Sequence, residues 1–151
     1  MIFHGFLPPE EIRHIMERCQ IHVFTSNWLE GWGAVVNEAM NSGCAEVASA
    51  AAGAVPYLIR QGVNGIAYPG DDFMQMAQAV LSLACNDGKR KEMGRKAMET
   101  ITGAWNAEHA AGELLRFSEE LLTGEPKGAD DGPLSPAPVI SERRMYSWMC
   151  Q

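Results

Sequence analysis

Three local patterns follow one another in IHVFTSNWLEGWGAVVNEAMNSGCAEVAS, residues 21–49. Residues 21–25 are a short apolar run that predicts a buried strand. The glycine-marked turn Gly31–Gly33 comes next, and residues 34–42 then predict a helix that stops at Gly43. Residues 45–49 return to a strand pattern. A strand, a helix and a second strand joined by short loops indicate a βαβ unit, in which the two strands are parallel.

The same alternation continues on both sides of this unit. Upstream, the apolar run Met1–Leu7 predicts a strand, and residues 10–19 predict a helix with prolines at its start. Downstream, residues 56–60 predict a brief helix and residues 65–68 a further strand. We therefore expect an α/β fold, a Rossmann-like parallel sheet flanked by helices on both faces.

From residue 71 to residue 122 the pattern is helical. Residues 73–84 predict an amphipathic helix that Asp71 is placed to cap, residues 87–102 a charged helix, and residues 106–122 a third helix. The residues expected to face inward are Phe73, Met76, Ala77, Val80, Leu81 and Ala84 in the first helix, Met93, Ala97 and Ile101 in the second, and Ala107, Ala110, Ala111, Leu114, Leu115, Leu121 and Leu122 in the third.

The chain divides by composition into three parts. Residues 1–123 are expected to form one folded domain, and residues 124–138, which are rich in Gly, Pro and Asp, a flexible linker. Residues 139–151 predict a C-terminal amphipathic helix. Because so short a helix is not stable alone, we expect Trp148 and Met149 to dock on another domain or a neighbouring chain.

Charge and composition exclude several classes of partner. The net charge of −7 leaves no broad basic surface for nucleic acid. The apolar stretch 47–59 is shorter than the roughly 20 residues of a membrane span, and the N-terminus lacks a signal-peptide pattern, so a cytoplasmic protein is expected. The four cysteines and four histidines lack metal-ligand spacing, so we expect no metal site and read the cysteines as buried or incidental thiols.

The loop after the strand at 21–25 has the residues of a ligand site. In a parallel sheet, ligands bind beyond the carboxyl ends of strands, and free amides at a helix start attract an anion such as a diphosphate. Two glycines let the backbone pass close to such a ligand. Glu30 precedes the turn and Glu38 lies in the helix, so two carboxylates are offset along the ligand and can accept hydrogen bonds from sugar hydroxyls. This arrangement favours a nucleotide sugar.

Two other kinds of site fit this stretch less well. A dinucleotide-binding fingerprint is disfavoured because Val36 stands where its third glycine belongs and no acid follows about twenty residues later. A glycosidase needs a close facing pair of carboxylates, which this offset does not supply. It remains open that Glu30 is a solvated loop acid and that Glu38 is favoured only by the helix dipole.

At these residues the chain resembles the retaining glycosyltransferases of the glycosyl transferases group 1 type, which have the two-domain GT-B fold. The shared features run in order through most of residues 1–115: Phe3–Gly5, Glu30–Gly33, Glu38–Gly43, Val47–Ser49, Gly53–Pro56, Asn64–Gly65 and Trp105. The resemblance implies the C-terminal half of that fold, with residues 1–123 as its nucleotide-sugar (donor) binding domain.

The resemblance also implies roles for single residues. Glu38 would bind the ribose hydroxyls, and Glu30, the residue expected at the catalytic centre, the hydroxyls of the transferred sugar. The donor would further be held by Gly31, Trp32, Gly33, Ala34 and Val35, with backbone amides on its diphosphate. Such enzymes are retaining hexosyltransferases that need no metal or cofactor beyond the nucleotide-sugar substrate.

Partners and pathway follow from the same resemblance. It implies an acceptor-binding N-terminal domain or partner chain outside this sequence, without which transfer is not expected. It also implies peripheral membrane association of a full-length enzyme, in the synthesis of cell-surface polysaccharide or lipopolysaccharide. Two alternatives stay open: a non-catalytic nucleotide-binding module or partner subunit, and a sugar-nucleotide epimerase of similar build, which the spacing of Glu30 and Glu38 disfavours.

Three positions depart from the family pattern. Glu46 replaces an apolar strand residue, Tyr57 replaces a glutamate and Ala54 replaces a glycine. Because a buried, unpaired carboxylate is costly, Glu46 predicts a more exposed strand end. The Arg and Lys that hold the diphosphate in this family lie upstream of the region that matches.

Overall fold

A three-stranded parallel sheet forms the centre of the computed structural model, which describes residues 1–27 and 29–137. Its order is β1-β2-β3, with β1 at Ile21–Phe24, β2 at Ala45–Ser49 and β3 at Gly65–Tyr68. The register places Val23 of β1 and Ile66 of β3 beside Val47 of β2. The predicted Rossmann-like parallel sheet is confirmed.

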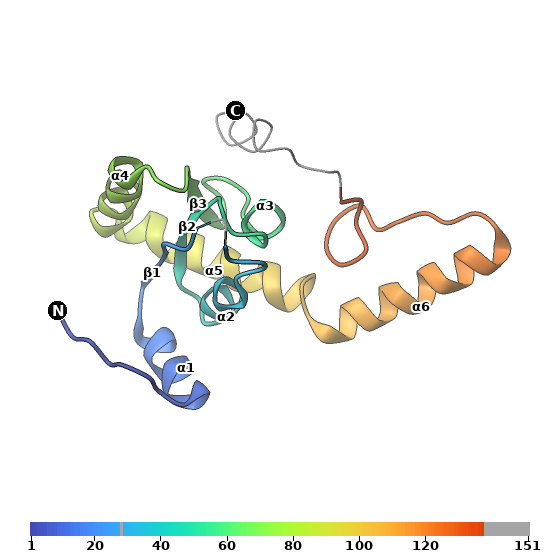
Figure 1. Ribbon diagram of the computed structural model, residues 1–151, viewed down its shortest axis with the longest axis horizontal. Coiled ribbons are helices and arrows are strands. Elements are labelled where there is room, and N and C mark those ends of the chain that lie inside the picture. The colour runs from blue at the N-terminus through green and yellow to red at the C-terminus, as the bar shows by residue number, and fades with distance from the viewer. Residues whose placement is uncertain (28, 138–151) are drawn as a thin grey trace.

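Helices pack on both faces of this sheet, and others lie farther from it (Figure 1). They are α1 (Pro9–Arg18), α2 (Ala34–Asn41), α3 (Val55–Leu58), α4 (Phe73–Ala84), α5 (Asp87–Gly103) and α6 (Ala107–Thr123). Side-chain caps explain where the last three begin, because Asp72, Asn86 and Asn106 each accept a hydrogen bond from an amide of the first turn. The expected cap Asp71 is therefore wrong by one residue.

The core lies on both faces of β2, and every residue of that strand is buried. Val47 points to one face, where it packs in a cluster with Tyr68 and Leu83, and Ala48 points to the other, in a cluster with Phe24 and Met40. Helix α5 joins the two clusters, since Met93 belongs to the first and both Ala97 and Ile101 to the second. The three inward residues predicted for this helix are confirmed.

The strand predicted at Met1–Leu7 is not formed. The segment leads into α1 without strand pairing, and Ile2, Phe3 and Phe6 are at least 80% exposed (Figure 1). An apolar run becomes a strand only where a neighbour supplies hydrogen-bond partners. β1 pairs with β2 on one side, and in the described part of the chain no strand lies on its other side.

Helix α4 turns a different face inward from the predicted one. Ala79 and Leu83 are buried and Met76 and Val80 partly buried, whereas Phe73 and Leu81 are more than 60% exposed. Apolar residues occur all round this helix, FMQMAQAVLSLA, so more than one stripe fits the helical period. Packing against the sheet determines which of these faces is buried.

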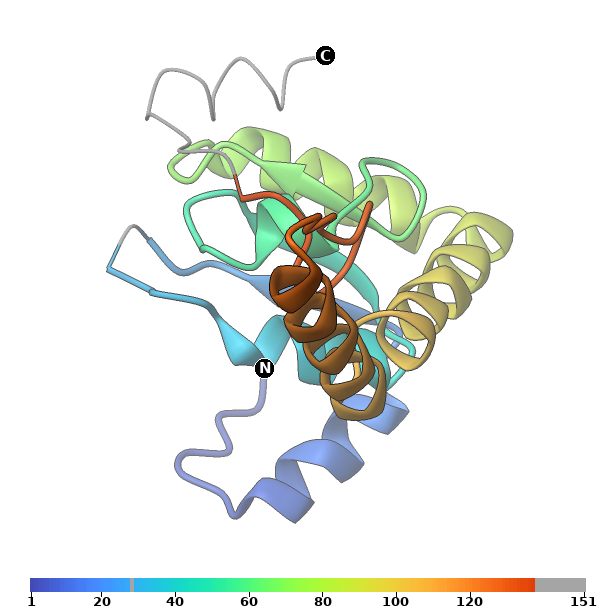
Figure 2. The same ribbon diagram turned by 90° about the vertical axis from the view of Figure 1, so that its right-hand side faces the viewer.

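Helix α6 extends away from the sheet beyond the end of α5 (Figures 1 and 2). It has no buried residue, and the expected inward residues Leu114, Leu115, Leu121 and Leu122 are 55–90% exposed. After Gly124, residues 125–137 form no helix or strand and return toward α3, where Asp131 pairs with Arg60. The division at residues 123 and 138 stays a prediction, and the helix predicted at 139–151 lies outside the described residues.

Glu46 is fully buried, so the expected exposed strand end is wrong. The parallel register puts His22 directly beside it, and the His22 Nδ1 atom lies 2.9 Å from both carboxylate oxygens. This cross-strand contact satisfies the carboxylate inside the fold. Burial raises the pKa of Glu46 above its ordinary value, and the hydrogen bond from His22 opposes that rise.

Candidate functional site

The turn before α2 is built on a left-handed glycine. Gly33 is the residue before the helix, with φ 87° and ψ 57°. A side chain here would be strained by that φ, and its Cβ would lie 3.1 Å from Cζ of the buried Phe24 ring. The backbone conformation and the nearby Phe24 ring therefore favour glycine directly before α2.

Two backbone hydrogen bonds tie this turn to the loop before α3. The Gly53 amide donates to the Gly31 carbonyl over 3.2 Å, and the Ala54 amide donates to the Trp32 carbonyl over 2.8 Å. A Cβ at Gly53 would lie only 2.1 Å from the Gly31 oxygen. The two loops, which follow the carboxyl ends of β1 and β2, thus depend on each other for their positions.

The start of α2 has backbone donors that find no acceptor inside the helix. The first amides of a helix have no acceptor within the helix, and in α2 these belong to Ala34 and Val35, while the Val36 amide already donates to the Gly33 carbonyl over 2.9 Å. These donors lie at the positive end of the helix dipole. The arrangement suits a phosphate or another anion.

The two predicted carboxylates occupy different surroundings. Glu30 is half-buried in the turn, and its amide donates to the Asn27 carbonyl over 3.0 Å. Glu38 is exposed on α2 and lines two surface hollows, one of about 310 Å³ beside Ile12 and Arg13 of α1 and one of about 530 Å³ beside Trp105. Glu30 lines neither of these two hollows.

Three aromatic side chains meet at the turn, a contact that the sequence patterns did not predict. The Trp32 ring stacks on Tyr57, with centroids 6.0 Å apart, and lies against Trp105, with centroids 5.9 Å apart. Trp32 also donates its indole N–H to Asn37 Oδ1 over 2.9 Å. These partners come from α3, from the segment between α5 and α6 and from α2, so only the folded chain brings them together.

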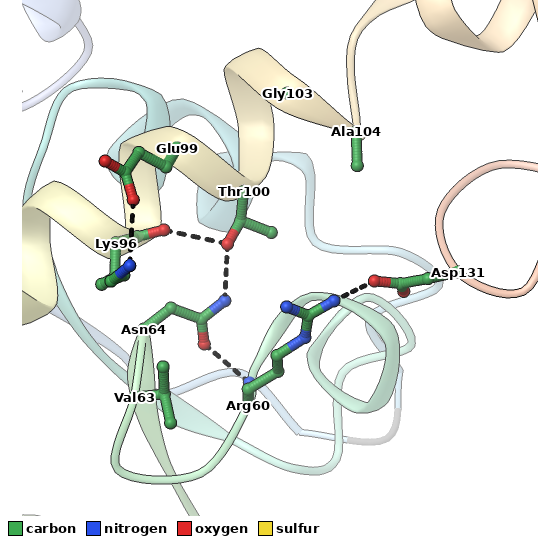
Figure 3. Close-up of a pocket in the computed structure, with 9 residues that line it drawn as sticks. All are labelled: Arg60, Val63, Asn64, Lys96, Glu99, Thr100, Gly103, Ala104 and Asp131. Carbon is green, nitrogen blue, oxygen red and sulfur yellow. Dashed lines mark hydrogen bonds and ion pairs between the residues drawn. The ribbon is translucent and has the colours of Figure 1, made fainter.

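A separate pocket of about 230 Å³ lies between the loop after α3 and helix α5 (Figure 3). At its base, the buried Asn64 amide donates to Thr100 Oγ1 over 2.9 Å and accepts from the Arg60 amide over 2.6 Å. Its cations are paired with acids, Arg60 with Asp131 and Lys96 with Glu99. No residue of the turn lines it, so we do not include it in the candidate site.

In the part of the chain that the structure describes, no group of three or more His, Cys, Asp or Glu side chains is placed to bind a metal ion. Among the same residues, no helix combines the length and apolar character that crossing a membrane requires.

Residues 1–100 match the family described as glycosyl transferases group 1. Among curated proteins, D-inositol 3-phosphate glycosyltransferase from Corynebacterium kroppenstedtii is 36% identical over 92 residues. That match covers 61% of this chain and 20% of the relative, so the chain spans about a fifth of the relative's length.

Solved structures show the same fold. The C-terminal domain of a glycosyl transferase group 1 family protein (LpcC) from Francisella tularensis matches with a TM-score of 0.65 and 29% identity, over 70% of this chain and 54% of that one. Sucrose-phosphate synthase from Thermosynechococcus elongatus matches with a TM-score of 0.68 and 22% identity, over 82% of this chain and 31% of that one. HepE from Anabaena, solved in complex with UDP, matches with a TM-score of 0.58 and 24% identity, over 72% and 29%.

Proposed function

We propose that this chain, which belongs to the glycosyl transferases group 1 family, forms the part of a glycosyltransferase that binds the nucleotide-sugar donor. The observation on which this rests is the turn before α2. A left-handed glycine there leads into a helix whose first amides have no acceptor within the helix, and in the sequence an acid precedes this helix start and another follows it. A donor with a diphosphate between two sugar rings has charges and hydroxyls in the matching order.

In this proposal each group has one role. The amides of Ala34 and Val35, together with the backbone of Gly31, Trp32 and Gly33, bind the diphosphate and the sugar next to it. Glu38 accepts hydrogen bonds from the ribose hydroxyls, and Glu30 accepts them from the transferred sugar. Backbone dipoles that stabilise the departing diphosphate would act without a metal ion.

The finer assignments rest on the sequence resemblance. We propose a retaining hexosyltransferase that acts on the cytoplasmic side in the synthesis of cell-surface polysaccharide or lipopolysaccharide. The acceptor and the second wall of the cleft would come from an N-terminal domain or a partner chain, and such an enzyme would associate peripherally with the membrane that holds its acceptor.

A titration of the 151-residue chain with UDP, GDP and ADP tests the donor site. We expect one of these nucleotides to shift the amide NMR signals of Gly33, Ala34, Val35 and Glu38 in a saturable way. Inorganic phosphate at the same concentrations is the control for a simple anion effect. If no nucleotide shifts the signals of this turn, the donor-site proposal is wrong.

A further inference from the structure

Trp32 is fixed more firmly than an exposed loop residue would be. Its ring plane is 23° from that of Tyr57 and 40° from that of Trp105, and its indole N–H is bonded to Asn37. Both centroid distances lie in the range of favourable aromatic pairs. We call Trp32, Tyr57 and Trp105 the aromatic cluster.

Within the aromatic cluster, Tyr57 and Trp105 contact Trp32, whose carbonyl also accepts a hydrogen bond from the next loop. Trp32 accepts a hydrogen bond from the Ala54 amide, and Tyr57 follows this loop in α3. The Trp32 side chain thus packs on α3 while its backbone binds the residues just before α3. Trp105, in the segment between α5 and α6, also contacts the Trp32 ring.

Movement of Trp32 would displace both functional parts of the turn. Glu30 lies two residues before it, and Gly33, the residue before α2, directly follows it. A small shift of the binding groups weakens binding. In a preorganised site folding has already positioned these groups, so they need not be ordered when the ligand binds. The rigidity of the turn therefore bears directly on the affinity for the donor.

We propose that Tyr57 and Trp105 are positioning residues of the donor site: through Trp32 they hold the turn, and with it Glu30 and the amides at the start of α2, in the conformation that binds the nucleotide sugar. This inference rests on the proposed function and assigns a role to Tyr57, one of the positions at which the chain departs from its family's pattern. Neither residue needs to touch the donor.

The test compares Tyr57→Ala and Trp105→Ala with the conservative variants Tyr57→Phe and Trp105→Phe. Calorimetry with the nucleotide that binds the unchanged chain is expected to show affinity lowered by about fivefold in each Ala variant, the effect of one aromatic pair. The Phe variants should keep most of the affinity. Amide hydrogen exchange in the free chain should be faster at Gly53 and Ala54 in the Ala variants only.

A further control variant shows whether a general loss of stability lowers nucleotide affinity. Leu83→Ala removes a fully buried side chain of α4 from the cluster on the opposite face of the sheet. It should lower the melting temperature while leaving nucleotide affinity and the exchange of Gly53 and Ala54 unchanged. Tyr57→Leu, which keeps bulk but removes the aromatic face, replaces Tyr57→Ala if that variant does not fold.

The outcomes distinguish a failure of the proposed donor-binding function from a failure of the positioning role. If the unchanged chain binds no nucleoside diphosphate, the proposed function fails, and this inference fails with it. If the chain binds a nucleotide and the Ala and Leu variants bind it equally well, the donor site stands and the positioning role is wrong. A loss of affinity in Leu83→Ala equal to that in Tyr57→Ala also overturns the positioning role.

Discussion

Glu38 lies on the exposed face of α2, where a carboxylate contributes little to the stability of the fold. Its replacement therefore tests binding with little interference from unfolding. We expect Glu38→Ala to weaken nucleoside-diphosphate binding at least tenfold, because one or two charge-assisted hydrogen bonds are lost at about 1.5–3 kcal/mol each. Calorimetry measures the change, and Glu10→Ala, in the exposed first turn of α1, is the control. Equal affinities of the two variants would remove Glu38 from the site.

Glu46 makes the stability of the chain depend on pH. Its pKa is raised in the folded state by burial, so the folded chain releases this proton at a higher pH than the unfolded chain does. The stabilising contribution is complete below the ordinary pKa of 4.5 and is lost as the pH rises through the folded pKa. We therefore expect the stability of Glu46→Gln relative to the unchanged chain to increase with pH.

Urea unfolding at a series of pH values from 4 to 8 measures this difference. His22, the partner of Glu46, is present in both chains, so the comparison measures the carboxyl group together with its contact to His22. Glu10→Gln changes an exposed acid and should show no such trend. A stability difference between Glu46→Gln and the unchanged chain that stays constant across the series would contradict the prediction.

At the scale of elements, α5 packs closely on the turn between α2 and β2. A Cβ added to Gly94 would lie 2.2 Å from the backbone oxygen of Gly43. That oxygen cannot move away unless the main chain shifts. Alanine favours a helix over glycine by about 0.5–1 kcal/mol, whereas overpacking costs about 1–3 kcal/mol. The steric cost should prevail, so Gly94→Ala is expected to destabilise the fold.

Gly88→Ala in the same helix is the matched control. The nearest atom to a Cβ at Gly88 is Asn86 Oδ1 at 3.7 Å, an ordinary contact. This variant should be as stable as the unchanged chain or slightly more stable in urea unfolding. If Gly94→Ala and Gly88→Ala have the same effect, α5 does not pack against Gly43 as described.

At the scale of the whole molecule, we expect the 151-residue chain to bind a nucleotide weakly and to transfer no sugar. Catalysis requires an acceptor held against the anomeric carbon in a closed cleft, and this chain spans 20% of the length of its curated relative. The cations Arg90 and Lys91 of α5 do not replace the basic residues that resemblance places upstream, because both pair with Asp87.

Incubation with labelled sugar nucleotides and candidate acceptors tests this expectation. Absence of product, together with the NMR shifts expected for nucleotide binding, would support a donor-binding part that needs a second domain or a partner chain. Sustained transfer that disappears in Glu30→Ala would contradict the expected inactivity and would make Glu30 essential for transfer.

The sequence by itself determined the features whose causes are local. The strand at 45–49 and the strand at 65–68 have the predicted bounds, because a short apolar run between turn residues permits little else. The helix that begins after Gly33 was likewise predictable, since a glycine turn and a following helical pattern lie within a few residues of each other. The prediction of a donor site at this turn rests on the same local grounds.

Only the tertiary structure decided the features that depend on a distant neighbour. Residues 1–7 have a strand's composition but no strand beside them, and α4 has several apolar faces among which only the position of the sheet could choose. Glu46 is buried because β1 brings His22 to its side, and Trp32 is fixed because Tyr57 and Trp105 reach it from later elements. A local pattern specifies what a segment can form, whereas burial and pairing depend on which surfaces the folded chain brings together.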